Sequence, residues 1–114
     1  MTDLIEYYLT LDADEKKKLC KKYMRWLLDR PCCINGTEGI VRHHVKVVGW
    51  YGTALKPPDV FCVPIDGREH NHLEHIHQNR YEKEKGICFI DILTGLHDLF
   101  SRLYDPQKIV EGEE

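Results

Sequence analysis

Six of the seven histidines of this chain lie in two short stretches, and its fold has to accommodate both. Residues 40–48 read IVRHHVKVV, where two adjacent histidines stand in a β-branched run that favours a strand. Residues 68–77 read REHNHLEHIH, which we expect to belong to a polar helix over roughly 69–83. Two such clusters, separated by a loop, need a common explanation.

The length of 114 residues and an apolar content of 42% suit one domain, residues 1–114, with a small core. Charged residues make up 31% of the chain, which is typical of a folded and well-solvated protein. No apolar run approaches the roughly 20 residues that span a bilayer. The start, MTDLIEYYL, has no cleavable signal pattern. We therefore expect an intracellular protein that does not enter a membrane.

The five cysteines include no C-x-x-C pair, which argues against a disulfide framework and an ordinary zinc knuckle. Only the adjacent Cys32 and Cys33 are placed to offer a metal ligand. The net charge of −3 gives no support to nucleic-acid binding. However, seven lysines and arginines gather in residues 16–30, whereas the last four residues, EGEE, are acidic. The basic run is a surface suited to phosphate contacts or, equally, an ordinary solvated helix face.

Both ends of the chain have helical patterns. Residues 2–9 predict a short helix capped by Thr2 or Asp3, and the pair Asp12 and Glu15 forms a capping box that begins a second helix. Pro31 ends that helix at residue 30. Near the other end, apolar residues recur at helical spacing over 89–104 before Asp105–Pro106 closes the segment.

The middle of the chain predicts extended structure. Residues 31–42 contain an NG turn signal and predict a hairpin-like pair of extended segments that leads to the histidine pair. Residues 49–59 are predicted to form a loop. VFCVP, residues 60–64, predicts a short buried strand that ends at its proline, and Gly86 is expected to end the helix of 69–83. The elements together predict an α+β fold.

Helical spacing suggests how the second cluster holds a metal. Residues four apart lie on one helix face, and Asn71 with His75, or His70 with Glu74, form such pairs. One histidine of the strand would complete a three-ligand site with an open position, as a catalytic metal site needs. Adjacent histidines on a strand point to opposite sides, so one can be a ligand and the other a general base.

Four stretches in this order, RHHVKVVG, GTALKPPD, VFCVPI and REHNHLEH, carry a resemblance to a known family. The chain resembles the HNH, or ββα-metal, nuclease superfamily, and most closely the short HNH-like domains of phages and prophages. Those domains have a histidine pair, a glycine-rich loop, a K-x-x-D step, an apolar strand ending in P-L-C, and a helix that reads R-E-H-H-x-x-x-H. The resemblance covers about residues 32–77.

The resemblance implies a small ββα-metal core over 31–85, flanked by the helical segment 1–30 and by the C-terminal helix and tail, 86–114. It implies that His44 is the catalytic base and that His43, Asn71 and His75 are metal ligands, when one extra residue is placed between Ile65 and Arg68. Without that residue, the ligand positions fall on His70 and Glu74. An amide oxygen favours Mg²⁺ or Mn²⁺, whereas a nitrogen-rich site favours Zn²⁺ or Ni²⁺.

Two departures from the family pattern concern cysteines. Asp66 stands where the family has the cysteine of P-L-C, and the usual upstream C-x-x-C is reduced to the Cys32–Cys33 pair. An auxiliary structural zinc site is therefore not expected.

The function that the resemblance implies is metal-dependent hydrolysis of DNA phosphodiester bonds in the host cytoplasm, in phage recombination or DNA processing. Two alternatives stay open: a catalytically degenerate HNH-fold protein that binds DNA, and a structural zinc module for protein contacts. The substrate form and the choice between monomer and homodimer also stay open. Residues near the histidines or in the basic run are candidate phosphate contacts, namely Arg42, Lys46, Arg68, Arg80, Lys17 and Lys21.

Overall fold

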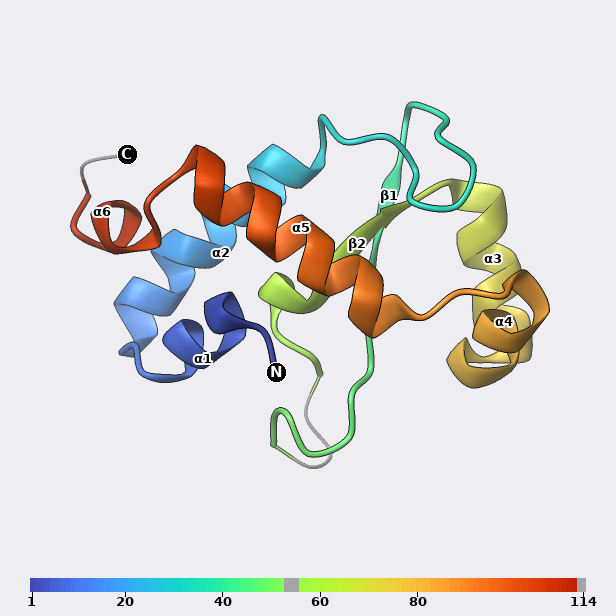
Figure 1. Cartoon of the computed structure of the whole chain (residues 1–114), viewed down its shortest axis with the longest axis horizontal. Coiled ribbons are helices and arrows are strands. Elements are labelled where there is room, and N and C mark those ends of the chain that lie inside the picture. Colours follow the sequence, from blue (N-terminus) through green and yellow to red (C-terminus); the bar gives the residue numbers. More distant parts are fainter. Residues whose placement is uncertain (53–55, 113–114) are drawn as a thin grey trace.

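The structure, a computed structural model, describes residues 1–52 and 56–112. Within them, six α-helices and a two-stranded antiparallel sheet form an α+β fold, as the sequence predicts (Figure 1). In chain order the elements are α1 (Asp3–Leu9), α2 (Ala13–Leu27), β1 (Val41–His44), the 3₁₀ helix η1 (Asp59–Phe61), β2 (Cys62–Ile65), α3 (Gly67–Ile76), α4 (Gln78–Lys85), α5 (Phe89–Leu103) and α6 (Pro106–Val110).

The terminal helices begin where their capping residues predict. The Thr2 side chain accepts the Ile5 N–H, and the capping box of α2 is complete, with Asp12 and Glu15 each binding the other's backbone N–H. The predicted helix over 89–104 is confirmed as α5. Pro106, which the sequence suggested as the end of helical structure, instead begins the short helix α6, because proline is well suited to a first helical turn.

The predicted hairpin within residues 31–42 is wrong. Residues 31–40 form turns and bends, with Gly36 at a φ of 74°, and β1 pairs instead with β2. In this register His43 lies opposite Val63, and His44 lies opposite Cys62. The buried strand predicted at 60–64 exists, displaced by two residues at its start because Val60 and Phe61 belong to η1. The true partner of β1 is distant in sequence, so local turn signals did not identify it.

The predicted polar helix over 69–83 is divided into two helices at His77. The backbone of His77 has φ 71° and ψ 156°, a combination that a residue with a Cβ rarely adopts and that no helix accommodates. The chain turns there, and α4 starts with Gln78 beside the loop after β1. Gly86 ends α4 in the left-handed conformation, as predicted.

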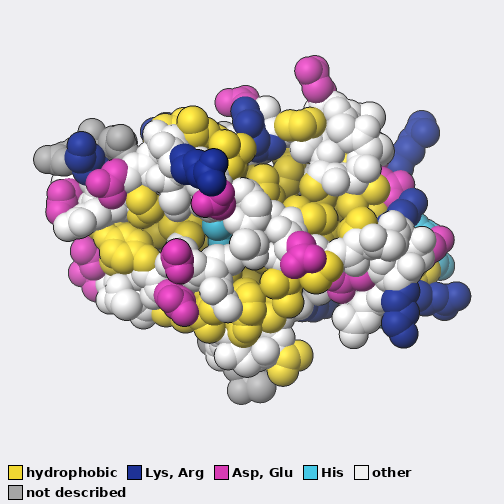
Figure 2. Space-filling view, in the orientation of Figure 1, with side chains coloured by type: hydrophobic (Ala, Val, Ile, Leu, Met, Phe, Trp, Pro, Cys, Tyr) yellow, Lys and Arg dark blue, Asp and Glu magenta, His cyan; other side chains and the backbone are white. Residues whose placement is uncertain are grey.

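The core forms between the sheet and the terminal helices. All residues of β2 are buried, α5 crosses one face of the sheet, and the hydroxyl of Tyr23 on α2 donates to the Cys62 carbonyl at 2.7 Å (Figure 1). On the face in Figure 2, hydrophobic side chains gather over and beside α5, and Lys and Arg side chains gather near α4. No helix of residues 1–52 and 56–112 is long and apolar enough to cross a membrane.

His97 on α5, the one histidine outside the two clusters, is a structural residue. Its side chain is buried, and its Nε2 lies 2.6 Å from the Val60 carbonyl, which can only accept. Nε2 therefore carries the proton, and Nδ1 accepts the Thr2 hydroxyl at 2.7 Å. Burial lowers the pKa of His97 to about 4, so the ring is neutral near pH 7 and joins the N-terminus to η1.

This network predicts a pH dependence of stability. The pKa of His97 is about 4 in the folded chain, and its ordinary value, 6.5, applies in the unfolded chain. The unfolded chain therefore protonates the His97 ring at a higher pH than the folded chain does. The stabilising contribution is complete above pH 6.5 and is lost as the pH falls toward 4, by about 3 kcal/mol at 1.36 kcal/mol per pH unit. Urea unfolding at several pH values should give a shallower slope in this range for His97→Gln. The exposed control His75→Gln should keep the wild-type slope, and equal slopes for all three proteins would refute the assignment.

Candidate metal site and basic groove

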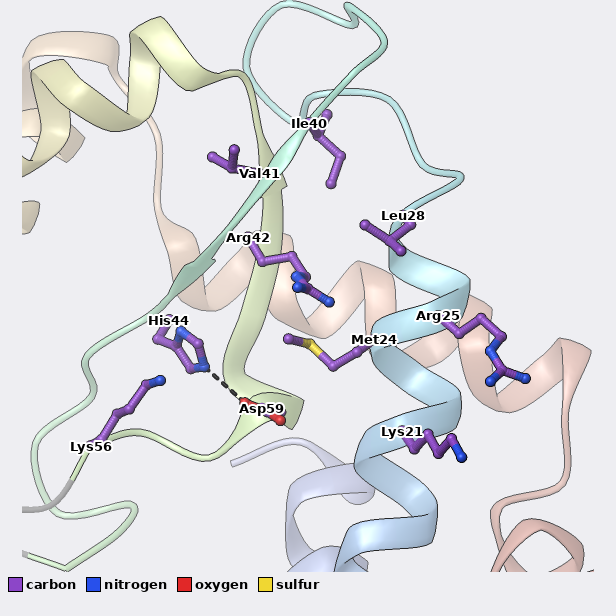
Figure 3. Close-up of a pocket in the computed structure, with 10 residues that line it drawn as sticks. All are labelled: Lys21, Met24, Arg25, Leu28, Ile40, Val41, Arg42, His44, Lys56 and Asp59. Atoms are coloured by element: carbon purple, nitrogen blue, oxygen red, sulfur yellow. Dashed lines mark hydrogen bonds and ion pairs between the residues drawn. The ribbon is translucent and has the colours of Figure 1, made fainter.

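The two adjacent histidines of β1 face opposite sides of the strand. His43 is buried, with its ring centroid 5.3 Å from that of Phe89 on α5 and 5.6 Å from that of His70 on α3. His44 is half-buried and faces η1, where its Nε2 lies 2.9 Å from Oδ1 of Asp59 (Figure 3). The alternation of side chains along a strand thus separates two chemical environments.

His43 has the properties of a metal ligand. Burial lowers its pKa to about 4, against the opposing effect of its hydrogen bond with Gln78, so the imidazole is neutral near pH 7. The neutral imidazole is the form that binds a metal ion. Charge on the neighbouring His70 and His44 also lowers the pKa of His43, whereas the Glu74 carboxylate raises it.

Gln78 determines which nitrogen of His43 is available. Its amide pairs with the backbone of Lys46 on both sides: Oε1 accepts the Lys46 N–H, and Nε2 donates to the Lys46 carbonyl, each at 2.9 Å. This pairing fixes the orientation of the amide, so Oε1 is the atom that lies 3.2 Å from Nε2 of His43. An amide oxygen only accepts, so His43 donates from Nε2 and keeps its lone pair at Nδ1.

Three donors converge on the α3 side of β1. One ligand atom each of His43, His70 and Glu74 lies within 4.8 Å of the others. His70 and Glu74 are one turn apart on α3, with 3.2 Å between Nε2 and Oε1, and their side chains are 28% and 59% exposed. A buried ligand with two solvent-accessible ligands suits a cation that keeps open coordination positions.

A second cluster, on the α2 side of β1, consists of His44, Asp59 and Cys62. Cys62 is buried, and burial raises the pKa of its thiol to about 12, so the sulfur stays protonated near pH 7. A protonated thiol is a poor metal ligand, because metals bind the thiolate. We therefore interpret this cluster as a hydrogen-bonded His44–Asp59 pair.

Asp59 is held in place by the chain around it. It is the first residue of η1, where the Phe61 N–H donates to the Pro58 carbonyl at 2.9 Å. The Phe61 carbonyl then accepts the Val45 N–H at 3.0 Å, which connects η1 to the residue after His44. The partner of His44 is therefore a carboxylate whose position is fixed by the backbone of η1.

A groove of about 720 Å³ opens beside this pair, between α2 and β1 (Figure 3). Its polar lining is basic apart from His44 and Asp59, and its remaining lining is apolar. The basic residues are Lys21, Arg25, Arg42 and Lys56, and the apolar ones are Met24, Leu28, Ile40 and Val41. A neighbouring pocket shares Lys21 and Asp59 and adds Lys16 and Lys17, so basic side chains continue along α2.

The structure brings together only part of the site that the sequence favoured. It places His43 with His70 and Glu74, the alternative alignment, whereas Asn71 and His75 are exposed on α3. In the part of the chain that the structure describes, neither His75 nor the Cys32–Cys33 pair joins a group of three ligands drawn from histidine, cysteine, aspartate and glutamate. Of the GTALKPPD stretch, residues 53–55 lie outside the described residues, as do residues 113–114 of the acidic tail.

The candidate phosphate contacts are dispersed. Lys21 and Arg42 line the groove, and Lys17 lines the pocket next to it. Lys46, Arg68 and Arg80 are exposed on the side of α3 and α4. Sequence reasoning missed Arg25, Lys56, Asp59 and Gln78 as site residues. Lys56 and Asp59 had a signal as the two ends of the K-x-x-D step, and Arg25 lay in the basic run of residues 16–30, whereas Gln78 had none.

The fold and the clusters define a small α+β protein with a three-ligand candidate metal site on the α3 side of β1 and a basic groove on the α2 side. Residues 8–100 match the family described as "Protein of unknown function (DUF968)", and the chain belongs to that family. No curated protein and no solved structure matches the chain.

The cluster predicts which substitutions weaken metal binding. His70→Ala and Glu74→Ala should each reduce the affinity for Mn²⁺ or Zn²⁺ by more than about 100-fold, because each removes one of three ligands, a larger loss than an outer partner causes. His75→Ala, on the same helix, should bind like wild type. Calorimetric titration with each ion measures this. A loss of binding in His75→Ala with retention in His70→Ala would instead support the Asn71–His75 alignment.

The hydrogen bond from His43 to Gln78 gives a second prediction. Gln78→Leu removes the acceptor that holds the ring with Nδ1 free, so metal affinity should fall by about 10- to 100-fold while all three ligands remain. Asn79→Leu changes the next, exposed residue of α4 and should bind the ion as wild type does. Equal affinities for Gln78→Leu and Asn79→Leu in the same titration would show that Gln78 does not orient the ligand.

Proposed function

We propose that this protein is a metal-dependent endonuclease of the HNH type, which hydrolyses phosphodiester bonds in DNA. The order β1, β2, α3 corresponds to the strand–strand–helix unit of the ββα-metal fold. The observation that carries the proposal is the convergence of His43 with His70 and Glu74, while the adjacent His44 is held by Asp59. One strand thus supplies a metal ligand and a positioned base.

In this proposal His43, through Nδ1, and the side chains of His70 and Glu74 hold one divalent cation. A cation at this position supplies electrostatic stabilisation of the negative charge that develops on the phosphate and the leaving oxygen. The donor set, two imidazoles and one carboxylate, is richer in nitrogen than the set with Asn71. It favours Zn²⁺ or Ni²⁺ over Mg²⁺ or Mn²⁺.

His44 is the proposed general base, and its hydrogen bond assigns the reacting atom. The Asp59 carboxylate is an acceptor, so Nε2 of His44 carries the proton and donates to it at 2.9 Å. The lone pair then lies on Nδ1, which takes a proton from the attacking water. Asp59 is a positioning residue in this scheme, because it fixes the tautomer and stabilises the protonated ring that results.

The number and exposure of the donors argue against a closed structural zinc site. Such a site has four protein ligands, whereas the His43 cluster has three, of which Glu74 is more than half exposed. A DNA-binding protein with an inactive centre would keep the same fold and groove, so activity measurements have to distinguish it. A role in phage recombination rests on the sequence resemblance.

The proposal is tested by nicking of supercoiled plasmid in the presence of Mn²⁺, Zn²⁺, Ni²⁺ or Mg²⁺. Wild type should nick with a transition metal, His44→Ala should lose at least about 100-fold in rate, within the typical contribution of a general base, and both should bind the metal equally. His72→Ala, which removes a histidine that pairs with Glu84 on α4, should nick as wild type does.

Asp59→Asn separates positioning from structural support. The variant should retain metal binding and show a lower rate with an altered pH–rate profile, because the tautomer of His44 is no longer fixed. Absence of nicking by wild type with every metal, although the metal binds, would refute the nuclease assignment and favour the binding protein.

A further inference from the structure

The groove between α2 and β1 has a local charge opposite to that of the chain. Four cationic side chains line it, Lys21 and Arg25 from α2, Arg42 from β1 and Lys56 from the loop before η1 (Figure 3). Its one carboxylate, Asp59, is engaged with His44. The net charge of the chain is −3, so this excess of positive charge is a local property of the groove. The positive charge of the groove is complementary to the negative charge of a polyanion.

The same groove has an apolar lining that phosphates do not explain. Met24 and Leu28 of α2 face Ile40, which directly precedes β1, and Leu28 is 53% exposed (Figure 3). Exposed aliphatic side chains next to basic ones offer a surface for the face of a nucleobase and for the phosphates beside it. Proteins that bind single strands combine a basic track with side chains, most often aromatic, that contact the faces of the bases. In this groove the side chains that offer this contact are aliphatic.

We propose that this groove binds one unpaired strand of DNA, with phosphates on the basic side chains and a base against the apolar lining. The inference rests on the proposed function and names its substrate: a single strand, or an unpaired segment at a fork or end. In a duplex the base faces are stacked and covered, so a duplex leaves the apolar lining unused. The groove volume of about 720 Å³ lies within the range of small-ligand pockets, which suits roughly one or two nucleotides.

The position of His44 connects binding to cutting. His44 and Lys56 line the groove, so the strand that the groove holds is the strand that passes the proposed base. Lys16 and Lys17 line the neighbouring pocket, which shares Lys21 and Asp59 with the groove, and they extend the basic track along α2. Unpaired DNA therefore reaches the reacting site along α2.

The test is fluorescence anisotropy with a labelled DNA strand and the matching duplex, both measured in EDTA so that no strand is cut. Wild type should bind the single strand at least tenfold more tightly than the duplex. Leu28→Asn should weaken single-strand binding by about fivefold to tenfold and leave duplex binding unchanged, because it removes the apolar lining alone. Arg25→Ala should also reduce the slope of log K against log salt by about 0.7, the value for one phosphate contact on a single strand.

Lys108→Ala, an exposed lysine on α6, is the matched control and should bind as wild type does. Circular dichroism verifies that each variant is folded. Equal or tighter binding of the duplex, or variants of Leu28 and Arg25 that match the control, would overturn the inference. If the protein prefers the single strand but does not nick plasmid, the groove proposal holds and the nuclease proposal fails. If it nicks plasmid but shows no preference for the single strand, the nuclease proposal holds and the groove proposal fails.

Discussion

The pairing of β1 with β2 is the contact on which the rest of the candidate site depends. Both strands are four residues long, and their register places His43 opposite Val63 and His44 opposite Cys62. Because side chains alternate along a strand, a slip of one residue would turn His43 toward α2 and His44 toward α3. Both faces of β2 are buried, so a slip would exchange the side chains that are packed on its two faces. The same contacts that stabilise the fold therefore assign the two histidines their different environments.

The second constraint is the break between α3 and α4. The turn at His77 places the side-chain amide of Gln78 against the backbone of Lys46. A helix that continued through residue 77 would place Gln78 elsewhere. The Gln78 amide forms hydrogen bonds with both the N–H and the carbonyl of Lys46, as a residue of a neighbouring strand would. The same amide orients the His43 ring. A strained backbone, of a kind that costs about 1–3 kcal/mol, is maintained here beside the three hydrogen bonds of the Gln78 amide. Helical periodicity could not reveal it.

The elements that sequence reasoning identified are those determined by nearby residues. The caps of Thr2 and Asp12, the period of α5 and the stop at Gly86 are local features, and the structure has each of them. The partner of β1 and the break at His77 depend on contacts between distant segments, and both were missed. The candidate metal site falls between these cases. Helical spacing allowed two pairs on α3, and only the tertiary position of His43 brings one of them, His70 with Glu74, into a cluster.

The separation of the two clusters by one strand limits how a phosphate can be bound in the proposed reaction. The cation on the α3 side and the base on the α2 side have to reach the same phosphorus, and the backbone of β1 lies between them. In the described residues β1 pairs with β2 alone, so its other edge is not covered by a strand. A phosphate at that edge is approachable from both faces. The basic groove opens on the His44 side, and a flexible single strand can bend from the groove over the edge of β1 more readily than a stiff duplex. The proposed preference for unpaired DNA and the division of the histidines between two faces thus have one geometric origin.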